Sequence, residues 1–288
     1  MKTKLSTLLI LTVLSAFLLM AMASGSSDES SITNSSSNSS SEKADIQETI
    51  LLERDGVKIT AKEMVTDIIW GDGIKLLVEN SSDTDLNISC DSMIVNDFMI
   101  TDMFYCTVAA GKKSNETLYL SSSDLKNSGI DNIGKIEFEF YASNNNYERI
   151  FENEYAVLET SLISKMDTST NVEGAELYNQ NNIKIIGKAV NEHDFWGSAV
   201  VLYIENNTDD EISVYCDNMS VNGFMVSPLF ASNIKPNKKA VDTITLFENE
   251  LEENDIESIE DIELSFRIIN SDNYNIIDET APMSFSTK

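Results

Sequence analysis

The chain repeats itself once, at a constant distance of 126 residues (216 − 90 = 126). The segment Cys90–Met99, with the sequence CDSMIVNDFM, returns as Cys216–Met225, with the sequence CDNMSVNGFM. The same distance relates Trp70 to Trp196, Asn80 to Asn206, Phe104 to Phe230, Lys112-Lys113 to Lys238-Lys239, and Ile136 to Ile262. Because no insertion separates these points, the sequence indicates a tandem duplication of one folded unit.

The duplication sets the predicted domain boundaries. We place the first repeat at residues 46–160 and the second at residues 175–288. The segment between them, residues 161–174, is polar and lacks proline, so we expect a flexible linker. A chain of 288 residues with 42% hydrophobic residues can bury a core in each repeat.

The N-terminal segment has the pattern of an export signal. Lys2 and Lys4 precede an apolar run, residues 5–20, which ends in Ala21-Met22-Ala23. This pattern predicts a signal peptide over residues 1–23, and the run is short for an uncleaved membrane anchor. The junction resembles that of a bacterial lipoprotein but lacks the cysteine that would be acylated, so lipid anchoring is not expected. Residues 24–45 are rich in serine and asparagine and predict a disordered tether.

The charge balance excludes one class of partner. The formal net charge is −28, and loss of a leader carrying two lysines would make it −30. Such a field opposes binding to nucleic acid or to an anionic membrane, because a phosphate-binding protein needs a basic surface. We therefore expect a secreted or cell-envelope protein that stays monomeric and does not insert into the membrane after signal cleavage.

Apolar alternation predicts a β-bulge at the same place in both repeats. Apolar residues alternate up to Cys90 and Cys216, and then the alternation changes parity. One extra residue restores the inward face, so we predict bulges near Asp91 and Asp217.

Two-residue turns follow the same repeat. Asp55-Gly56, Asn96-Asp97 and Asn222-Gly223 each separate two apolar runs, and Asn181-Asn182 occupies the place of Asp55-Gly56 in the second repeat. These residue types tolerate positive φ, so they predict tight β-hairpins.

These elements indicate an all-β fold. Turn signals recur about every 8–12 residues, and only residues 124–129 and 250–254 have the pattern of short capped helical turns. We predict two tandem immunoglobulin-like antiparallel β-sandwich domains after a disordered N-terminal segment. Trp70 and Trp196 each precede a central strand, so we expect both to pack in the cores, although the Cys…Trp…Cys order of antibody domains is absent.

One motif resembles a known family. Val-Asn-x-Phe-Met occurs at residues 95–99 and 221–225, and each copy is followed by a phenylalanine and then by Lys-Lys. It resembles a module of secreted proteins and lipoproteins of Gram-positive anaerobic bacteria, over roughly residues 50–287. The resemblance implies a β-sandwich and an exported location. It implies no activity, because none is assigned to that family.

The cysteines are few and unevenly placed. Cys90 matches Cys216, whereas Cys106 matches Ser232, so the second repeat folds without a partner for a bridge. We predict buried free thiols, with a Cys90–Cys106 disulfide as the alternative. Paired CxxC spacing is absent, so we expect neither a zinc site nor a cofactor.

The sequence contains no familiar catalytic motif. His193 is the only histidine, in a polar stretch that predicts a solvated loop. Abundant acids leave a carboxylate-based hydrolase open, with Asp91 and Asp217 as the residues to test. Our main expectation is that both aspartates accept backbone N–H bonds in turns and that the chain is not an enzyme. Weak cation binding at acidic loops such as residues 83–85 and 209–211 is also left open.

The remaining hypothesis is a surface that recognises a binding partner. Met99 and Met225 have the parity opposite to Phe98 and Phe224, which we expect in the core. If exposed, the two methionines and Tyr105 would form a binding surface. The leading hypothesis is therefore recognition or adhesion, with a protein or glycan partner, at or beyond the cell surface. The alternative from a different class is the carboxylate-based hydrolase, and a purely structural spacer is the third possibility.

Overall fold

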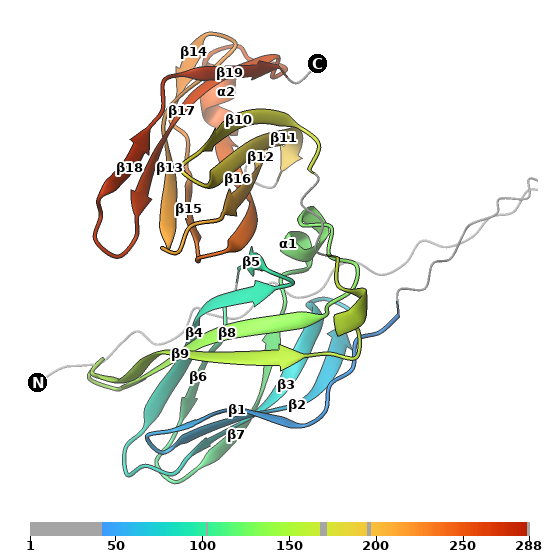
Figure 1. Cartoon of the computed structure of the whole chain (residues 1–288), viewed down its shortest axis with the longest axis vertical. Coiled ribbons are helices and arrows are strands. Elements are labelled where there is room, and N and C mark those ends of the chain that lie inside the picture. Colours follow the sequence, from blue (N-terminus) through green and yellow to red (C-terminus); the bar gives the residue numbers. More distant parts are fainter. Residues whose placement is uncertain (1–41, 102, 168–171, 195–196, 287–288) are drawn as a thin grey trace, which may run out of the picture. The chain divides into compact units, whose positions relative to one another are not determined.

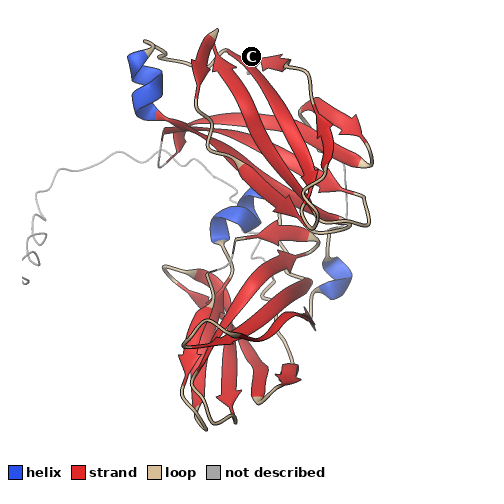
Figure 2. Cartoon of the chain, turned by 90° about the vertical axis from the view of Figure 1, so that its left-hand side faces the viewer, coloured by secondary structure: helices blue, strands red, loops and turns tan. Residues whose placement is uncertain are grey.

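A computed structural model describes residues 42–101, 103–167, 172–194 and 197–286, and the side chains of 189, 191–194, 197 and 286 are not among those described. The predicted signal peptide, most of the predicted tether, and Trp196 lie outside the described residues. Strands dominate the described chain, and the helices are short (Figure 2).

The first repeat contains two layers of strands (Figure 1). One layer has the order β1-β2-β3-β7. The other has the order β5-β4-β8-β9, with β6 also beside β4. The elements are β1 (Thr49–Arg54), β2 (Val57–Asp67), β3 (Gly71–Asn80), β4 (Leu86–Val95), β5 (Phe98–Ile100), β6 (Tyr105–Val108), β7 (Lys113–Tyr119), α1 (Ser122–Asn127), β8 (Lys135–Asn144) and β9 (Arg149–Glu159).

The second repeat has corresponding layers. One layer has the order β10-β11-β12-β16, and the other β14-β13-β17-β18, with β15 beside β13 and β19 beside β17. The elements are β10 (Ala175–Gln180), β11 (Ile183–Asp194), β12 (Gly197–Asn206), β13 (Ile212–Val221), β14 (Phe224–Val226), β15 (Ala231–Ile234), β16 (Lys238–Phe247), α2 (Glu248–Glu253), β17 (Asp261–Asn270), β18 (Ile276–Glu279) and β19 (Met283–Ser286).

The strand order is immunoglobulin-like. In the first repeat β2-β3-β7 and β4-β8-β9 match the A-B-E and C-F-G strands of that fold. Side chains of both layers meet in one core, as Ile59 and Ile74 do with Ile88 and Phe138. In the second repeat the same places are taken by buried residues of β11, β12, β13 and β17. The predicted fold class is confirmed.

The predicted turns are confirmed. Positive φ values of 49° at Asp55, 53° at Asn181, 50° at Asn96 and 50° at Asn222 show left-handed backbone at the first position of each two-residue turn. In Asn222-Gly223 the glycine follows with φ 85°, a value that a side chain would oppose. Both strands of each hairpin are thereby held in one register.

The predicted bulges are confirmed as well. The pairing of β4 with β8 shifts between Cys90 and Ser92, and that of β13 with β17 shifts between Cys216 and Asn218. The extra residues at these shifts are Asp91 and Asp217. Both cysteines stay buried, and Cys90, Cys106 and Cys216 all remain outside disulfides, as predicted.

A buried asparagine organises one loop in each repeat. The Asn80 side-chain amide donates to the carbonyl oxygens of Thr84 and Val108, both at 2.8 Å. Asn206 donates to Asp210 at 2.8 Å and to Ile234 at 2.9 Å. These bonds replace backbone pairing in the acidic loops for which cation binding was left open.

The prediction that Trp70 packs in the core is wrong. Its side chain is 63% exposed. The turn between β2 and β3 is closed by the Asp67 carboxylate, which accepts from the backbone N–H of Ile69 at 2.7 Å and of Trp70 at 3.0 Å. This turn places the indole beyond the strand, where it rests against the Tyr119 ring at 6.1 Å between centroids.

Two further predictions need correction. Phe224 is 48% exposed, whereas Phe98 is 9% exposed, so only the first-repeat phenylalanine lies in a core. His193 lies in strand β11 and not in a loop, and its side chain is outside the described residues.

In the predicted linker, Leu162 is buried beside a short 3₁₀ turn, Ile163–Lys165. The remaining linker residues 168–171 lie outside the described residues.

The predicted helical turns are present with shifted ends. Helix α1 begins at Ser122, where the Ser121 hydroxyl accepts from the backbone N–H of Asp124 at 3.3 Å. Helix α2 begins at Glu248, and each helix buries a single leucine, Leu125 or Leu251. In the sequence, each helix connects the last strand of one layer to the next strand of the other layer, α1 between β7 and β8 and α2 between β16 and β17.

Candidate functional site

The two candidate aspartates have different surroundings. Both are exposed and lie in strands, so the expectation that they close turns is wrong. The Asp217 carboxylate accepts two bonds from the Arg267 guanidinium, at 2.9 and 3.1 Å. Arg267 in turn lies over the Tyr215 ring, 4.9 Å from its centroid. An acid paired in this way is committed to a cation of its own sheet.

Asp91 and Met99 line one cavity of about 370 Å³, together with Asp124, Asp242 and residues of β15 and β16. Burial raises the pKa of Asp242, although its carboxylate accepts from the backbone N–H of Thr243 at 2.7 Å. Asp217, Tyr105 and Met225 are not among its lining residues. The structure thus brings two of the five predicted site residues together.

Tyr105 and Met225 lie on separate strands, β6 and β14, and are 63% and 67% exposed. The Tyr105 hydroxyl donates to the side-chain oxygen of Asn87 at 3.0 Å. Met99 is half-buried and packs against the second-repeat core. The three residues therefore do not form the single surface predicted from parity.

A junction between strands β5 and β16 explains the burial of Met99. The two strands pair in parallel at Phe98 and Lys239, and the backbone N–H of Lys239 donates to the Asp97 carbonyl at 2.9 Å. The Phe98 ring meets Tyr203 edge-on, with 6.3 Å between centroids. Tyr203 is only 1% exposed.

A charge cluster lies beside this strand pair. The Lys238 ammonium is 2.9 Å from Asp97 Oδ1 and 2.8 Å from Glu137 Oε1. Lys135 is 2.8 Å from the same two oxygens. Tyr155 donates its hydroxyl to the other Glu137 oxygen. Two carboxylates and two ammonium groups balance within the cluster.

The ammonium groups outweigh desolvation in this cluster. Burial alone would raise the pKa of the Glu137 carboxyl, but hydrogen bonds from Lys135, Lys238 and Tyr155 hold that pKa below its usual value. Burial would likewise raise the pKa of Asp97, but its hydrogen bonds from Lys135 and Lys238 lower that pKa. Burial opposes the charge of Lys135, yet its two carboxylate partners raise its pKa. Asp97, Lys135 and Glu137 are therefore charged at neutral pH.

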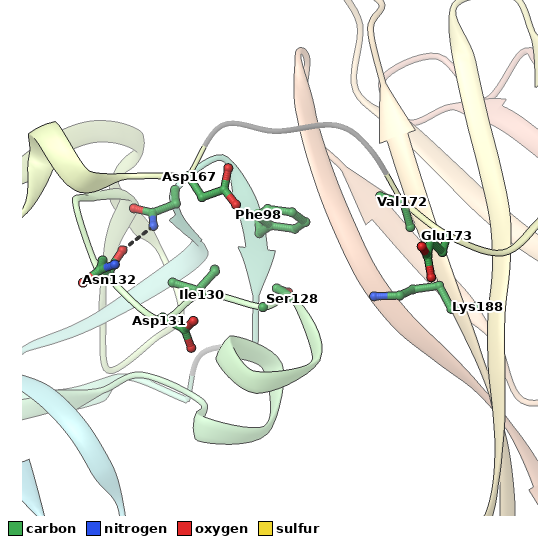
Figure 3. A pocket seen from close by; sticks show the side chains of 11 residues that line it. Phe98, Ser128, Ile130, Asp131, Asn132, Asp167, Val172, Glu173 and Lys188 are labelled. Carbon is green, nitrogen blue, oxygen red and sulfur yellow. Dashed lines mark hydrogen bonds between the residues drawn. The ribbon is translucent and has the colours of Figure 1, made fainter. Parts of the chain in front are cut away.

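A second cavity, of about 480 Å³, lies next to Phe98 (Figure 3). Its lining combines Asp131, Asp167 and Glu173 with Lys188. The Asn96 amide, which donates to the Asn132 carbonyl at 2.6 Å, forms one wall. Carboxylates of this kind, spread around a polar wall, resemble an ordinary solvated surface more than a built ligand site.

A largely apolar cavity lies at Trp70 and has a volume of about 530 Å³. Its described lining residues are all uncharged, and Asp102, between the lining residues Thr101 and Met103, lies outside the described residues. Ile69 and Met103 are 82% and 93% exposed at its edge. The lining residues are Ile69, Trp70, Thr101, Met103, Phe104, Thr117, Leu118, Tyr119, Leu120, Ser121, Ser122 and Ser123. We call this surface the Trp70 groove.

The second repeat has a strand bridge at the position of Met103 and Tyr119, although the counterparts of Ile69 and Trp70 lie outside the described residues. Leu229, the counterpart of Met103, forms a bridge with Thr245, the counterpart of Tyr119. The backbone N–H of each residue donates to the carbonyl of the other, at 3.4 and 3.3 Å. Among the described residues of the first repeat, β7 pairs with β3 alone. This bridge is a difference between the described parts of the two repeats, and the groove was not predicted because Trp70 was expected in the core.

The described residues do not bring together three or more His, Cys, Asp or Glu side chains in a metal-binding arrangement. None of the helices in the described part of the chain has the length and apolar character that a bilayer crossing requires. Chemically, the described surfaces offer apolar contact and charge pairing.

Comparison with known proteins gives no family. No family model matches the chain, and no curated protein matches it. Solved structures with some likeness include the SafA pilin in complex with the SafB chaperone from Salmonella enterica, at 13% identity, 74% coverage of this chain, 88% of that chain and a TM-score of 0.21. The YadV chaperone matches at 13% identity, with 73% and 92% coverage and a TM-score of 0.24. A protein of unknown function from Porphyromonas gingivalis matches at 11% identity, with 75% and 90% coverage and a TM-score of 0.20. The immunoglobulin-like assignment accordingly rests on the strand order described above.

Proposed function

We propose that this chain is an exported, non-enzymatic recognition protein that binds an apolar segment of another protein in the Trp70 groove. The observation that carries the proposal is the exposed indole of Trp70, set against Tyr119 in a groove whose described lining residues are uncharged. Tryptophan and tyrosine are the side chains most enriched at binding hot spots.

The exposure of this surface has an energetic cost that binding would remove. Ile68, Ile69, Trp70 and Met103 are 103%, 82%, 63% and 93% exposed and lie close together in a strongly acidic chain. A contiguous apolar patch on a soluble protein marks an interaction surface. Covering a large apolar side chain contributes about 1.5–3 kcal/mol.

The lining favours a protein over a glycan. Among the described lining residues, the polar side-chain groups are the indole N–H of Trp70 and the hydroxyls of Thr101, Thr117, Tyr119 and the three serines at 121–123, without a carboxylate, amide or guanidinium. Aliphatic and thioether side chains at the edge suit the apolar side chains of a peptide better than the hydroxyls of a sugar.

The free edge of β7 supplies a second element of recognition. An extended segment could pair its backbone with this edge while its side chains enter the groove, which is the mode called β-augmentation. The apolar leader, the serine-rich segment after it, and the resemblance to an exported Gram-positive module support an extracellular or cell-envelope location for such binding.

The test is selection of peptides from a displayed library on the purified chain, followed by titration of the selected peptides. Trp70→Ser should weaken their binding by about tenfold or more, since it removes the central aromatic contact. The matched control is Tyr147→Ser, an 88% exposed aromatic outside the groove lining, which should leave binding unchanged. Binding to a glycan array that Trp70→Ser abolishes, with no peptide selected, would replace the protein partner by a glycan. Equal binding by both variants would refute the site.

A further inference from the structure

The β5–β16 junction joins two edges that recur elsewhere in the duplicated chain. By the 126-residue offset, β5 corresponds to β14 and β16 corresponds to β7. Within the chain, β5 is paired with β16. Among the described residues, β14 pairs with β13 alone and β7 with β3 alone. Each chain therefore holds one used pair of edges and one unused pair.

The unused β14 edge keeps the apolar residues of its counterpart. Phe98 and Met99 of β5 are covered at the junction, whereas Phe224 and Met225 of β14 are 48% and 67% exposed. These four side chains occupy equivalent positions in the repeat. An edge strand with exposed apolar side chains is a template for pairing with another strand.

The unused β7 edge keeps the lysines of its counterpart. At the junction, β16 contributes Lys238, and Lys188 of β11 donates to the Asn127 carbonyl at 3.4 Å. The equivalent residues on the β7 side are Lys112 and Lys62. Lys113, the counterpart of Lys239, is also exposed. The basic side of the junction is thus present twice.

The acidic side of the unused pair complements these lysines. The positions of Lys135, Glu137 and Asn127 are taken in the second repeat by Asp261, Glu263 and Glu253. All three acids are exposed. Only Asp97 loses its charge, because Gly223 takes its place. The β14 side therefore presents acids where the β7 side would present lysines.

We propose that the β14 edge of one copy pairs in parallel with the β7 edge of a second copy, in the manner of the β5–β16 junction. Lys112 then meets Glu263, as Lys238 meets Glu137, with Asp261 beside them. Lys113 takes the place of Lys239, which lies over the Phe98 ring, 5.4 Å from its centroid. Phe224 covers Leu77, which is half-buried at the place where Tyr203 lies in the second repeat. This contact shares the β7 edge with the β-augmentation considered above, but it uses the Lys112–Lys113 end, whereas the Trp70 groove lies at the Thr117–Tyr119 end. It does not depend on the proposed function, and it gives an oligomer where the sequence led us to expect a monomer.

Such a contact joins two different surfaces. A head-to-tail contact of this kind leaves one β14 edge and one β7 edge free at the ends of every oligomer, so growth continues unless a ring closes. Because the contributing charges are exposed, the association should weaken as the salt concentration rises.

The test is sedimentation velocity of the purified chain, residues 24–288, over a range of concentrations at low salt. We expect the mean sedimentation coefficient to rise with concentration. Phe224→Asp should reduce the association constant by about tenfold or more, because it adds a charge to an apolar contact beside two acids. Tyr274→Asp, which changes a 77% exposed aromatic elsewhere in the second repeat, is the matched control and should associate as the parent does.

A mixing experiment distinguishes this geometry from others. Phe224→Asp blocks the β14 edge, and Lys112→Glu combined with Lys113→Glu blocks the β7 edge. Each variant alone should stay monomeric, and an equimolar mixture should give dimers and nothing larger, since each chain keeps one working edge. If Phe224→Asp lowers the melting temperature, Met225→Asp replaces it. A parent chain whose sedimentation does not change with concentration, a lysine variant that still dimerises alone, or a mixture that stays monomeric would each overturn the proposal.

Discussion

Replacing Lys238 with methionine tests the charge cluster at the β5–β16 junction. The substitution keeps the length and apolar stem of the side chain and removes its ammonium group. Glu137, whose side chain is 2% exposed, then loses one of its two lysine partners. Asp97 loses the same partner and also keeps only Lys135. The balanced cluster acquires a net negative charge at a partly buried place, where the Asp97 side chain is 29% exposed and that of Glu137 is covered.

The expected cost follows from the bonds that are lost. Lys238 makes two charge-assisted hydrogen bonds, at 2.9 and 2.8 Å, and such bonds contribute about 1.5–3 kcal/mol each. Glu137 keeps Lys135 and the Tyr155 hydroxyl, so part of its stabilisation survives. We therefore expect the free energy of unfolding to fall by about 2–3 kcal/mol, and the melting temperature by about 4–10 °C.

The assay is equilibrium urea unfolding at low protein concentration, followed by tryptophan fluorescence. Lys112→Met is the matched control, because Lys112 is the exposed counterpart one repeat earlier and should cost less than about 0.5 kcal/mol. A Lys238→Met variant as stable as Lys112→Met would refute the reasoning.

The dependence of this cost on pH provides an internal check. The pKa values of Asp97 and Glu137 are lowered in the folded chain, so their stabilisation is present above the ordinary values of 3.8 and 4.5 and is lost as the pH falls through the folded values. The difference between Lys238→Met and the parent chain should accordingly shrink on acidification. A difference that stays constant down to about pH 3 would show that it arises from packing and not from charge.

Three further predictions concern single side chains. Asp242→Asn should raise the melting temperature at neutral pH, because burial raises the pKa of Asp242 and the ionised carboxylate therefore destabilises the folded chain. Melting curves should show the gain above the raised pKa and no gain below about 3.8. Asn206→Ala should cost about 2–3 kcal/mol in urea unfolding, since several carbonyls lose their donor, whereas the exposed neighbour Asn207→Ala should cost less than about 0.5 kcal/mol. Burial raises the pKa of both Cys106 and Cys216 to about 12, so an aromatic disulfide reagent at about pH 8 should label these thiols only after unfolding; rapid labelling of the native chain would contradict their burial.

Much of the fold could be predicted because it depends on local rules. The change of parity after Cys90 required an extra residue, and the structure has it at Asp91. Asn222-Gly223 required a two-residue turn because its residue types accept positive φ, and both adopt it. Agreement between the two repeats doubled the weight of each signal.

The errors arose where a neighbour in space decides the outcome. Phe98 and Phe224 have identical sequence positions in their repeats, and only the first is covered, because β16 lies beside β5. Trp70 follows the apolar pattern of a core residue, yet the Asp67 turn places it beyond the strand. Periodicity records which face of a strand is apolar and contains no information about which edge is occupied.

The junction cluster could not be predicted for a related reason. The residues shared by both repeats indicated Asp91 and Asp217, which do not line one cavity together. The junction cluster instead depends on positions that differ, since Asp97 and Lys135 become Gly223 and Asp261. A comparison of the charged positions that differ between the two repeats would have indicated the junction from the sequence alone.

The junction also imposes an order on biosynthesis. The β5 edge of the first repeat is complete long before its cover exists, because 88 residues lie between the end of β9 at Glu159 and the end of β16 at Phe247 (247 − 159 = 88). At about 5–20 residues per second, synthesis leaves Phe98 and Met99 uncovered for about 4–18 s. During that interval a nascent chain presents the same open edge to its neighbours on a polysome, and the arrival of β16 ends its exposure.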